Sequence, residues 1–371
     1  MNLELKNISS PEKAAAELAA LYNKYGYTTF KMSKFEDYDL YASNREFLVA
    51  DNFVTFTDMN GKLKALKPDV TLSIIKNSED APGVTRKVCY CENVYRVSKG
   101  TGLFREITQT GLECFGEVDA CCVGEVLMLA AESLNMLSGE FVLDICQSDI
   151  VRAAVNGIVP DERTRSLIIR AFGSKNAEEI PEIITRGNAA ADGDKIAAVK
   201  ELACIYGTPG ETLGRIRRIA LLFGAEKEYE TLKNAVAVFK GTRLEKMIRL
   251  DFSSVEEGEY YNGIIFHGFL PGVPVRVLSG GCYDMLMRKF GRNSGAAGFA
   301  VYIDELERLF PDEDGFDADV LLLYGPDCTP AEVTGKVAEL AAEGYSVRLA
   351  AGPEALPKDF RYREIRRVNA K

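Results

Sequence analysis

The sequence predicts an α+β fold, with an antiparallel sheet flanked by helices, a helical insertion and a small C-terminal α/β unit. Segments rich in β-branched and aromatic residues follow one another through short turns, which favours antiparallel pairing. Helical patterns punctuated by glycine then replace them, and the chain ends in a strand, a helix and a strand. We therefore expect a core in two parts, residues 1–146 and 249–313, with an insertion at 147–248 and a separate unit at 314–371.

The first predicted element is a helix at residues 11–25, because Ser10 can cap it and apolar residues recur at helical spacing until Gly26. Alternating and β-branched patterns predict a series of strands. They are expected at residues 27–30, 53–58, 64–66, 86–96, 104–114, 141–145, 263–269, 275–279 and 298–302. The sequence Met59-Asn60-Gly61-Lys62 supplies a hairpin turn between two of them.

Helical spacing and capping residues define the insertion and the C-terminal unit. Insertion helices are expected at residues 164–171, 197–205, 216–223 and 229–238. In the C-terminal unit, a strand at 318–324, a capped helix at 330–344 and a strand at 346–350 form a βαβ unit. The basic tail at 358–371 is interpreted as a solvated segment or an edge strand rather than a tRNA contact, because charge runs usually face water.

Composition limits the class of function. The 371 residues are 47% hydrophobic and 27% charged, as in a globular protein, and the net charge of -10 gives no overall attraction to nucleic acid. The nine cysteines show no C-x-x-C spacing and there is one histidine, so no metal site is expected. Since neither a secretory signal nor an apolar run of membrane-spanning length is found, we expect a cytoplasmic protein.

A polar cluster lies on the predicted strand at 104–114. Its period of two places Arg105, Gln109, Gly111 and Glu113 on one face. Gly111 leaves room where a ligand could lie, while the Gln109 amide and the Glu113 carboxylate can receive an ammonium or an imidazole. The same spacing also fits a strand whose polar face simply meets solvent.

Two further segments could contribute to a site. Asp69 and Thr71 precede an apparent helix, which Asp69 could cap without any ligand. Farther along, a pair of tyrosines ends at Tyr261, and Gly280-Gly281 leads through Tyr283 into another helix. Paired tyrosines are often packing residues, and the glycine pair could either bring backbone N–H groups to an anion or form a plain turn.

Motifs for nucleotide chemistry are missing from the sequence. It contains no G-x-x-x-x-G-K-[ST] loop, no G-x-G-x-x-G after a strand, and no acidic pair before a small phosphate-binding loop. His267, the only histidine, lies between Phe266 and Gly268, which fits a packed or edge position and leaves no obvious general base. No cofactor and no catalytic residue is therefore expected.

The order of these segments over residues 1–310 resembles the catalytic core of the class II histidyl-tRNA synthetases. The matching segments are residues 26–36 for the dimer-forming first motif, 95–116 for the second motif, and 260–263 with 279–284 for the histidine signature. Ser33 stands where that family usually keeps proline. The C-terminal unit resembles a shortened anticodon-binding domain.

This resemblance implies which residues bind histidine. They are the residues that match the family's amino-acid pocket: Asp69, Thr71, Arg96, Gln109, Glu113, Tyr261 and Tyr283. The resemblance also implies that adenylate formation is lost, because arginines that stabilise the ATP phosphates are replaced. Leu103 and Glu305 stand at two such positions, Glu256 replaces the arginine of the histidine signature, and the loop at 97–101 is shortened.

A synthetase-like fold with a retained amino-acid pocket and a lost ATP site is similar to the regulatory subunits of short-form ATP phosphoribosyltransferases. That resemblance implies a homodimer without chemistry of its own. It would assemble with the short catalytic subunit and take part in allosteric feedback by histidine on the first step of histidine biosynthesis. Two alternatives stay open, namely a histidyl-tRNA synthetase paralogue and a module that senses histidine or tRNA for another partner.

Overall fold

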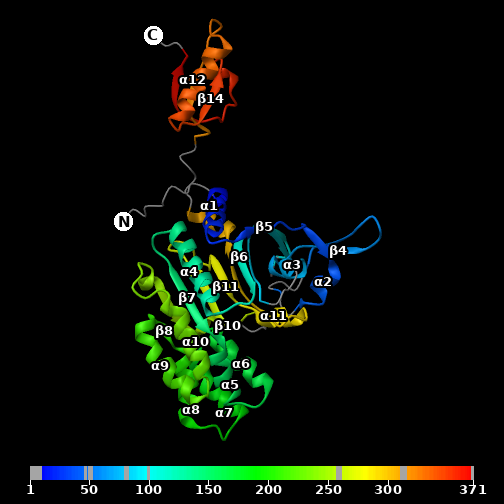
Figure 1. Cartoon of the computed structure of the whole chain (residues 1–371), viewed down its shortest axis with the longest axis vertical. Coiled ribbons are helices and arrows are strands. Elements are labelled where there is room, and N and C mark those ends of the chain that lie inside the picture. Colours follow the sequence, from blue (N-terminus) through cyan, green and yellow to red (C-terminus); the bar gives the residue numbers. More distant parts are fainter. Residues whose placement is uncertain are drawn as a thin grey trace. The chain divides into compact units, whose positions relative to one another are not determined.

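The computed structural model describes residues 11–45, 48, 53–78, 83–97, 101–255, 261–309 and 316–368. The chain forms two compact units, Met1–Leu309 and Phe310–Lys371 (Figure 1). Glu256, Tyr260 and the middle of the loop at 97–101 lie outside the described residues.

A nine-stranded, mainly antiparallel sheet forms the centre of the larger unit (Figure 1). In spatial order its strands are β1 (Thr28–Thr29), β5 (Thr85–Val97), β6 (Phe104–Gly116), β12 (Gly295–Tyr302), β11 (Leu278–Cys282), β10 (Asn262–Phe269), β7 (Val142–Gln147), β9 (Ile248–Asp251) and β8 (Tyr206–Gly207). Only the β1–β5 and β7–β9 pairs are parallel. The strand expected at 275–279 is wrong by several residues, and β8 and β9 were not expected.

Two helices, α1 (Pro11–Lys24) and α4 (Ala120–Leu137), pack against this sheet and against each other. The Tyr22 and Ser133 hydroxyls meet between them at 3.0 Å. The helix expected at the N-terminus is confirmed, whereas α4 was not expected. Among the described residues α4 alone has the length and composition of a membrane-spanning helix, and half of it is buried in this unit.

Along the chain, six α-helices connect β7 to β9, two strands that are neighbours in the sheet. They are α5 (Ser148–Asn156), α6 (Glu162–Gly173), α7 (Ile180–Gly187), α8 (Gly193–Ala203), α9 (Pro209–Leu222) and α10 (Glu226–Ala237). Side-chain caps fix several starts: Asp161 accepts from the Thr164 amide at 2.8 Å, and Thr208 forms a capping box with Glu211. The four helices expected here are confirmed, while α5 and α7 are additional.

A small three-stranded sheet supports the region that will form the site. It consists of β2 (Phe35–Asp37), β4 (Leu63–Leu66) and β3 (Thr55–Thr57), accompanied by the short helices α2 (Tyr38–Ala42), α3 (Thr71–Lys76) and α11 (Asp284–Lys289). The expected hairpin turn joins β3 and β4, and Asp58 accepts hydrogen bonds from the amides of Asn60 and Lys62, both at 2.9 Å. A buried apolar cluster that includes Tyr41, Ile74 and Leu286 unites these elements.

The smaller unit is a parallel three-stranded sheet in the order β14–β13–β15. Its elements are β13 (Ala318–Leu323), α12 (Pro330–Ala342), β14 (Val347–Ala350) and β15 (Tyr362–Arg367). The helix starts at a capping box between Thr329 and Glu332. The expected βαβ arrangement is confirmed, and the basic tail forms an edge strand.

Candidate functional site

A polar pocket lies on one face of the large sheet, where β5, β6, β11 and β12 meet α3 and the residue before α11. Its walls combine acidic, phenolic and small residues: Asp69, Val70, Thr71, Tyr90, Arg96, Gln109, Glu113, Tyr261, Ser279, Tyr283, Gly298, Phe299, Ala300 and Tyr302. The structure therefore brings together all seven residues predicted for histidine binding. Arg105, on the same strand, is not among the lining residues.

Glu113 is the centre of the pocket. Its Oε1 accepts a hydrogen bond from Thr71 Oγ1 at 2.6 Å, and its Oε2 accepts one from Tyr283 Oη at 2.6 Å. The side chain is 2% exposed, and burial raises the pKa of Glu113 to about 8 despite the two hydroxyl donors. The interpretation of this strand face as solvent-facing is therefore wrong.

Asp69 and Arg96 line the pocket next to the start of α3. Asp69 Oδ1 accepts from the Leu72 amide at 2.9 Å, so the expected helix cap is present, and the same residue lines the pocket. Burial raises the pKa of Asp69, against the lowering effects of the Leu72 amide and of Arg96. Arg96 Nε donates to the Pro68 carbonyl at 3.1 Å, which fixes the guanidinium beside this carboxyl.

Neutral phenols surround the two acids. Burial raises the pKa values of Tyr90 and Tyr261 well above that of free tyrosine, so both keep their hydroxyl protons at physiological pH. The pocket thus offers two carboxyls, one amide, several hydroxyls and one guanidinium, a set suited to a small cationic or hydrogen-bond-donating ligand. The sequence analysis allowed Tyr261 to be only a packing residue, but the structure places it in the lining of the pocket.

Sequence reasoning missed Tyr90, although a signal was available. Tyr90 is the partner of Gly111 across the β5–β6 pair, and a Cβ on Gly111 would lie 2.7 Å from Tyr90 Oη. Gly111 therefore makes space for a phenol rather than directly for a ligand. The Gly280-Gly281 pair lies within β11, so neither the turn nor the anion-binding interpretation holds, and a Cβ on Gly281 would meet the Tyr261 ring at 2.7 Å.

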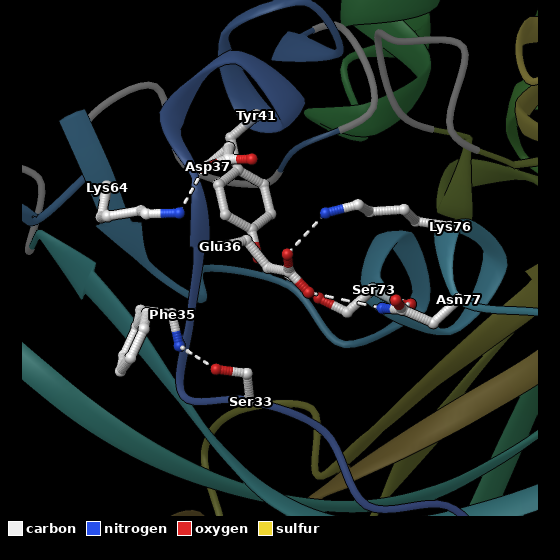
Figure 2. Close-up of polar contacts among 9 residues, drawn as sticks. All are labelled: Ser33, Phe35, Glu36, Asp37, Tyr41, Lys64, Ser73, Lys76 and Asn77. Carbon is white, nitrogen blue, oxygen red and sulfur yellow. Dashed lines mark hydrogen bonds and ion pairs between the residues drawn. The ribbon is translucent and has the colours of Figure 1, made fainter. Parts of the chain in front are cut away.

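Polar contacts hold α3, and with it Thr71, against the small sheet (Figure 2). Glu36 accepts hydrogen bonds from Lys76 Nζ at 2.6 Å and from Asn77 Nδ2 at 3.3 Å. Lys76 is the last residue of α3, and Asn77 follows it. Nearby, the Tyr41 and Ser73 hydroxyls lie 3.2 Å apart. Figure 2 shows the side chain of Glu36, a residue of β2, reaching toward Lys76 and Asn77, so this carboxylate links β2 to α3.

Ser33 takes over part of the turn before β2. Its Oγ accepts a hydrogen bond from the Phe35 amide at 3.3 Å, as Figure 2 shows. A serine hydroxyl that bonds the backbone two residues on stabilises a turn, which is the role that a proline ring would play by fixing φ. The departure from the family pattern at this position is thus compatible with the observed chain path.

Replacing Glu36 by glutamine is expected to reduce the free energy of unfolding by roughly 1 kcal/mol, because a partly buried ion pair is lost while its hydrogen bonds weaken. Urea unfolding measures the change. Glu182→Gln removes an ion pair with Arg186 that is largely exposed, so it should leave stability nearly unchanged. Equal effects of the two substitutions would show that Glu36 does not anchor α3.

The positions where ATP-binding arginines were expected carry other groups. Leu103 is 66% exposed and offers no charge, and Glu305 lies in the short helical segment Ile303–Leu309. The adjacent Asp304 accepts from the Thr108 amide at 3.1 Å. Among the described residues that line the pocket, Arg96 is the one arginine.

The sheet, its covering helices and the pocket define a protein with the class II aminoacyl-tRNA synthetase-like fold. The family model described as histidyl-tRNA synthetase matches residues 3–306. The chain therefore belongs to the histidyl-tRNA synthetase family.

Regulatory subunits are prominent among its relatives. A protein of Oceanobacillus iheyensis named ATP phosphoribosyltransferase regulatory subunit is 28% identical over 341 residues, which are 88% of this chain and 83% of the relative. A Bacillus halodurans structure, of an ATP phosphoribosyltransferase regulatory subunit/histidyl-tRNA synthetase, has a TM-score of 0.79 at 21% identity and covers 96% of this chain and 93% of that chain. A chain of the ATP phosphoribosyl transferase complex from Thermotoga maritima has a TM-score of 0.60 at 19% identity, with coverages of 79% and 97%.

Proposed function

We propose that the chain is the regulatory subunit of a short-form ATP phosphoribosyltransferase. As a cytoplasmic homodimer it assembles with the separate catalytic subunit, permits its activity, and transmits inhibition by histidine in the first step of histidine biosynthesis. The chain itself carries no chemistry. The observation that carries this proposal is the pocket around Glu113, which is lined by the seven candidate histidine-binding residues, combined with Leu103 and Glu305 where a synthetase needs arginines.

Histidine fits the chemistry of the pocket. Its ammonium and imidazole N–H groups are donors, and Glu113, Asp69 and Gln109 present acceptors from three different segments. The cavity between these walls is about 40 Å³, room for only a few water molecules. Binding of histidine, which is larger than this cavity, therefore requires part of the lining to move, which couples occupancy of the pocket to the position of neighbouring elements.

Histidine binding is expected to release a proton below about pH 8. Glu113 has a folded-state pKa raised to about 8, so at neutral pH it is mostly protonated and must ionise to accept from a cationic donor. Affinity should rise with pH toward 8, by at most about tenfold per pH unit, and level off above it. Calorimetry from pH 7 upward, where most of the free imidazole is neutral, in two buffers of different ionisation enthalpy measures the proton count.

The same shift has a consequence for stability. The folded-state pKa of Glu113 is raised above its unfolded value. At low pH the carboxyl is uncharged in both states and does not reduce the free energy of unfolding, which then falls as pH rises toward about 8. The Glu113→Gln variant should show neither this fall nor the proton release. A proton count of zero for the unmodified chain at pH 7 would contradict the assignment of Glu113 as ligand acceptor.

The proposal is tested by mixing the purified chain with the short-form catalytic subunit of the same organism and measuring phosphoribosyl-ATP formation. Activity should depend on the mixture and should fall when L-histidine is added. If the catalytic subunit is equally active alone and the two chains do not associate, the proposal fails.

The retained pocket also supports a second candidate function, that of a histidyl-tRNA synthetase paralogue. That function requires the chain alone to form an adenylate. Histidine-dependent exchange between ATP and pyrophosphate measures it directly, and we expect none, because each lost arginine contact costs on the order of 10² to 10³ in rate. Measurable exchange would favour the synthetase over the regulatory subunit.

A further inference from the structure

A second polar groove lies on the same face of the large sheet, beyond the pocket just described. It is bordered by β7, β9, β10 and the C-terminal end of α6, and has a volume of about 760 Å³. Among the described lining residues none is shared with the first pocket. The register of the sheet accounts for the common face, since Asp144 pairs with His267, which pairs with Ser279 of the first pocket.

Asp144 is the unusual residue in this groove. It lies within β7 between Leu143 and Ile145 and is 7% exposed. Its Oδ1 has no hydrogen-bond partner, and in the described part of the chain only one other buried side-chain oxygen, on Thr110, shares that condition. Buried carboxyl oxygens are normally paired, because an unsatisfied one costs folding free energy. Asp144 therefore lacks a donor that a ligand could supply.

The neighbouring acid shows what a satisfied carboxylate looks like in the same groove. Asp251, at the end of β9, is 4% exposed. Its Oδ1 accepts from the amide and the hydroxyl of Ser253 at 2.8 and 2.6 Å, and its Oδ2 pairs with Lys175 Nζ at 3.2 Å. The contrast indicates that Asp144 is left open while its neighbour is fully bonded.

Basic groups complete the groove. Lys175 follows α6 in a left-handed conformation, with φ of 56°, and its side chain is 68% exposed at the rim. Arg276 Nη1 lies 3.1 Å from His267 Nε2, and since a guanidinium only donates, that nitrogen accepts. Arg170 also lines the groove. The floor is thus acidic and the remaining lining carries several cations.

We propose that this groove is a second ligand site, which takes an α-amino acid with its ammonium on Asp144 and its carboxylate toward Lys175 and the neighbouring arginines. A zwitterion brings a donor for the open acceptor of Asp144 and a carboxylate for the largely exposed ammonium of Lys175. A metal ion is a poor match, because no group of three or more metal-ligating side chains occurs in the described part of the chain. The site is independent of the histidine pocket around Glu113.

Electrostatics around Asp144 agree with this assignment. Burial and then the charge of Asp251 raise the pKa of Asp144 to about 7, while Lys175 and Arg249 act in the opposite direction. The titratable and charged groups near it on the packed elements are Cys146, Lys175, Tyr206, Arg249, Asp251 and His267. A ligand ammonium would replace the proton that Asp144 otherwise takes up near neutral pH.

The test uses the full chain and each of the protein L-amino acids as probes, with binding followed by saturation-transfer NMR and calorimetry. The Asp144→Asn variant keeps the shape of the side chain, and Glu113→Gln serves as the matched change in the other pocket. We expect at least one amino acid whose affinity falls at least tenfold in Asp144→Asn and is unchanged in Glu113→Gln. The corresponding N-acetyl amino acid, which has no ammonium, should not bind at this site.

A stability measurement guards against a folding defect. Because the folded-state pKa of Asp144 is raised, its charge destabilises the chain above about pH 7, so Asp144→Asn should raise the melting temperature at pH 8 and not at pH 4. Lys175→Gln, a change at the rim of the groove, should lower the affinity for the same amino acid severalfold. If both variants fold and bind every amino acid as the unmodified chain does, or if Mg²⁺ binds at Asp144 and amino acids do not, the proposal is overturned.

Discussion

Replacing Gly298 by alanine is expected to reduce the free energy of unfolding by more than about 3 kcal/mol and to abolish histidine binding. A Cβ at this position would lie 2.5 Å from the Leu112 carbonyl oxygen and 2.7 Å from Glu113 Cδ. The carbonyl belongs to the neighbouring strand β6, paired in register with β12, so it cannot withdraw without opening the sheet. The methyl group would also displace the carboxylate at the centre of the pocket.

Denaturant unfolding and calorimetry with L-histidine measure the two effects. Gly139→Ala is the matched control, because a Cβ there meets no heavy atom within 4 Å, and it should change neither quantity appreciably. A folded Gly298→Ala chain that binds histidine normally would mean that β6 and β12 do not pack as described.

The Glu113→Gln substitution is expected to keep the fold and remove histidine feedback. Glutamine has the shape of glutamate and can still bond Thr71 and Tyr283, so the walls of the pocket should persist. The charge that receives the ligand is lost, however, and losing one partner of a buried charged pair costs about 2 to 5 kcal/mol. Histidine affinity should therefore fall by roughly 30-fold to several thousand-fold.

Mixing with the catalytic subunit gives the readout. The variant complex should form and remain active, while histidine no longer inhibits it. Glu106→Gln lies on the same strand but at its exposed end, bonded to Asn93 and Tyr95, and should leave inhibition intact. Loss of activity without histidine in Glu113→Gln would indicate a role for this residue in assembly rather than in binding the effector.

Local patterns predicted most elements because their causes are local. The helix at the N-terminus depends on the spacing of its apolar residues, and its expected cap, Ser10, lies outside the described residues. The helix α12 depends on its capping box, and the β3–β4 turn on Asp58 and one glycine. The helix α4 escaped prediction because it is apolar on nearly all sides, so it lacks the one-sided pattern of a surface helix. The strand β11 was misplaced because its glycines weaken the strand pattern at its centre.

The sequence by itself determined the fold class, because local patterns of residue types define most elements, and its motifs determined the family resemblance. That resemblance implied the seven candidate pocket residues. Only the tertiary structure decided that these residues meet, since Glu113 bonds Thr71, 42 positions away, and Tyr283, 170 positions away. The tertiary structure also determined the surroundings of Asp144, which the sequence alone shows only as a polar residue in an apolar strand. Its burial, its open oxygen and its basic neighbours arise from sheet register, which brings together segments that no local pattern relates.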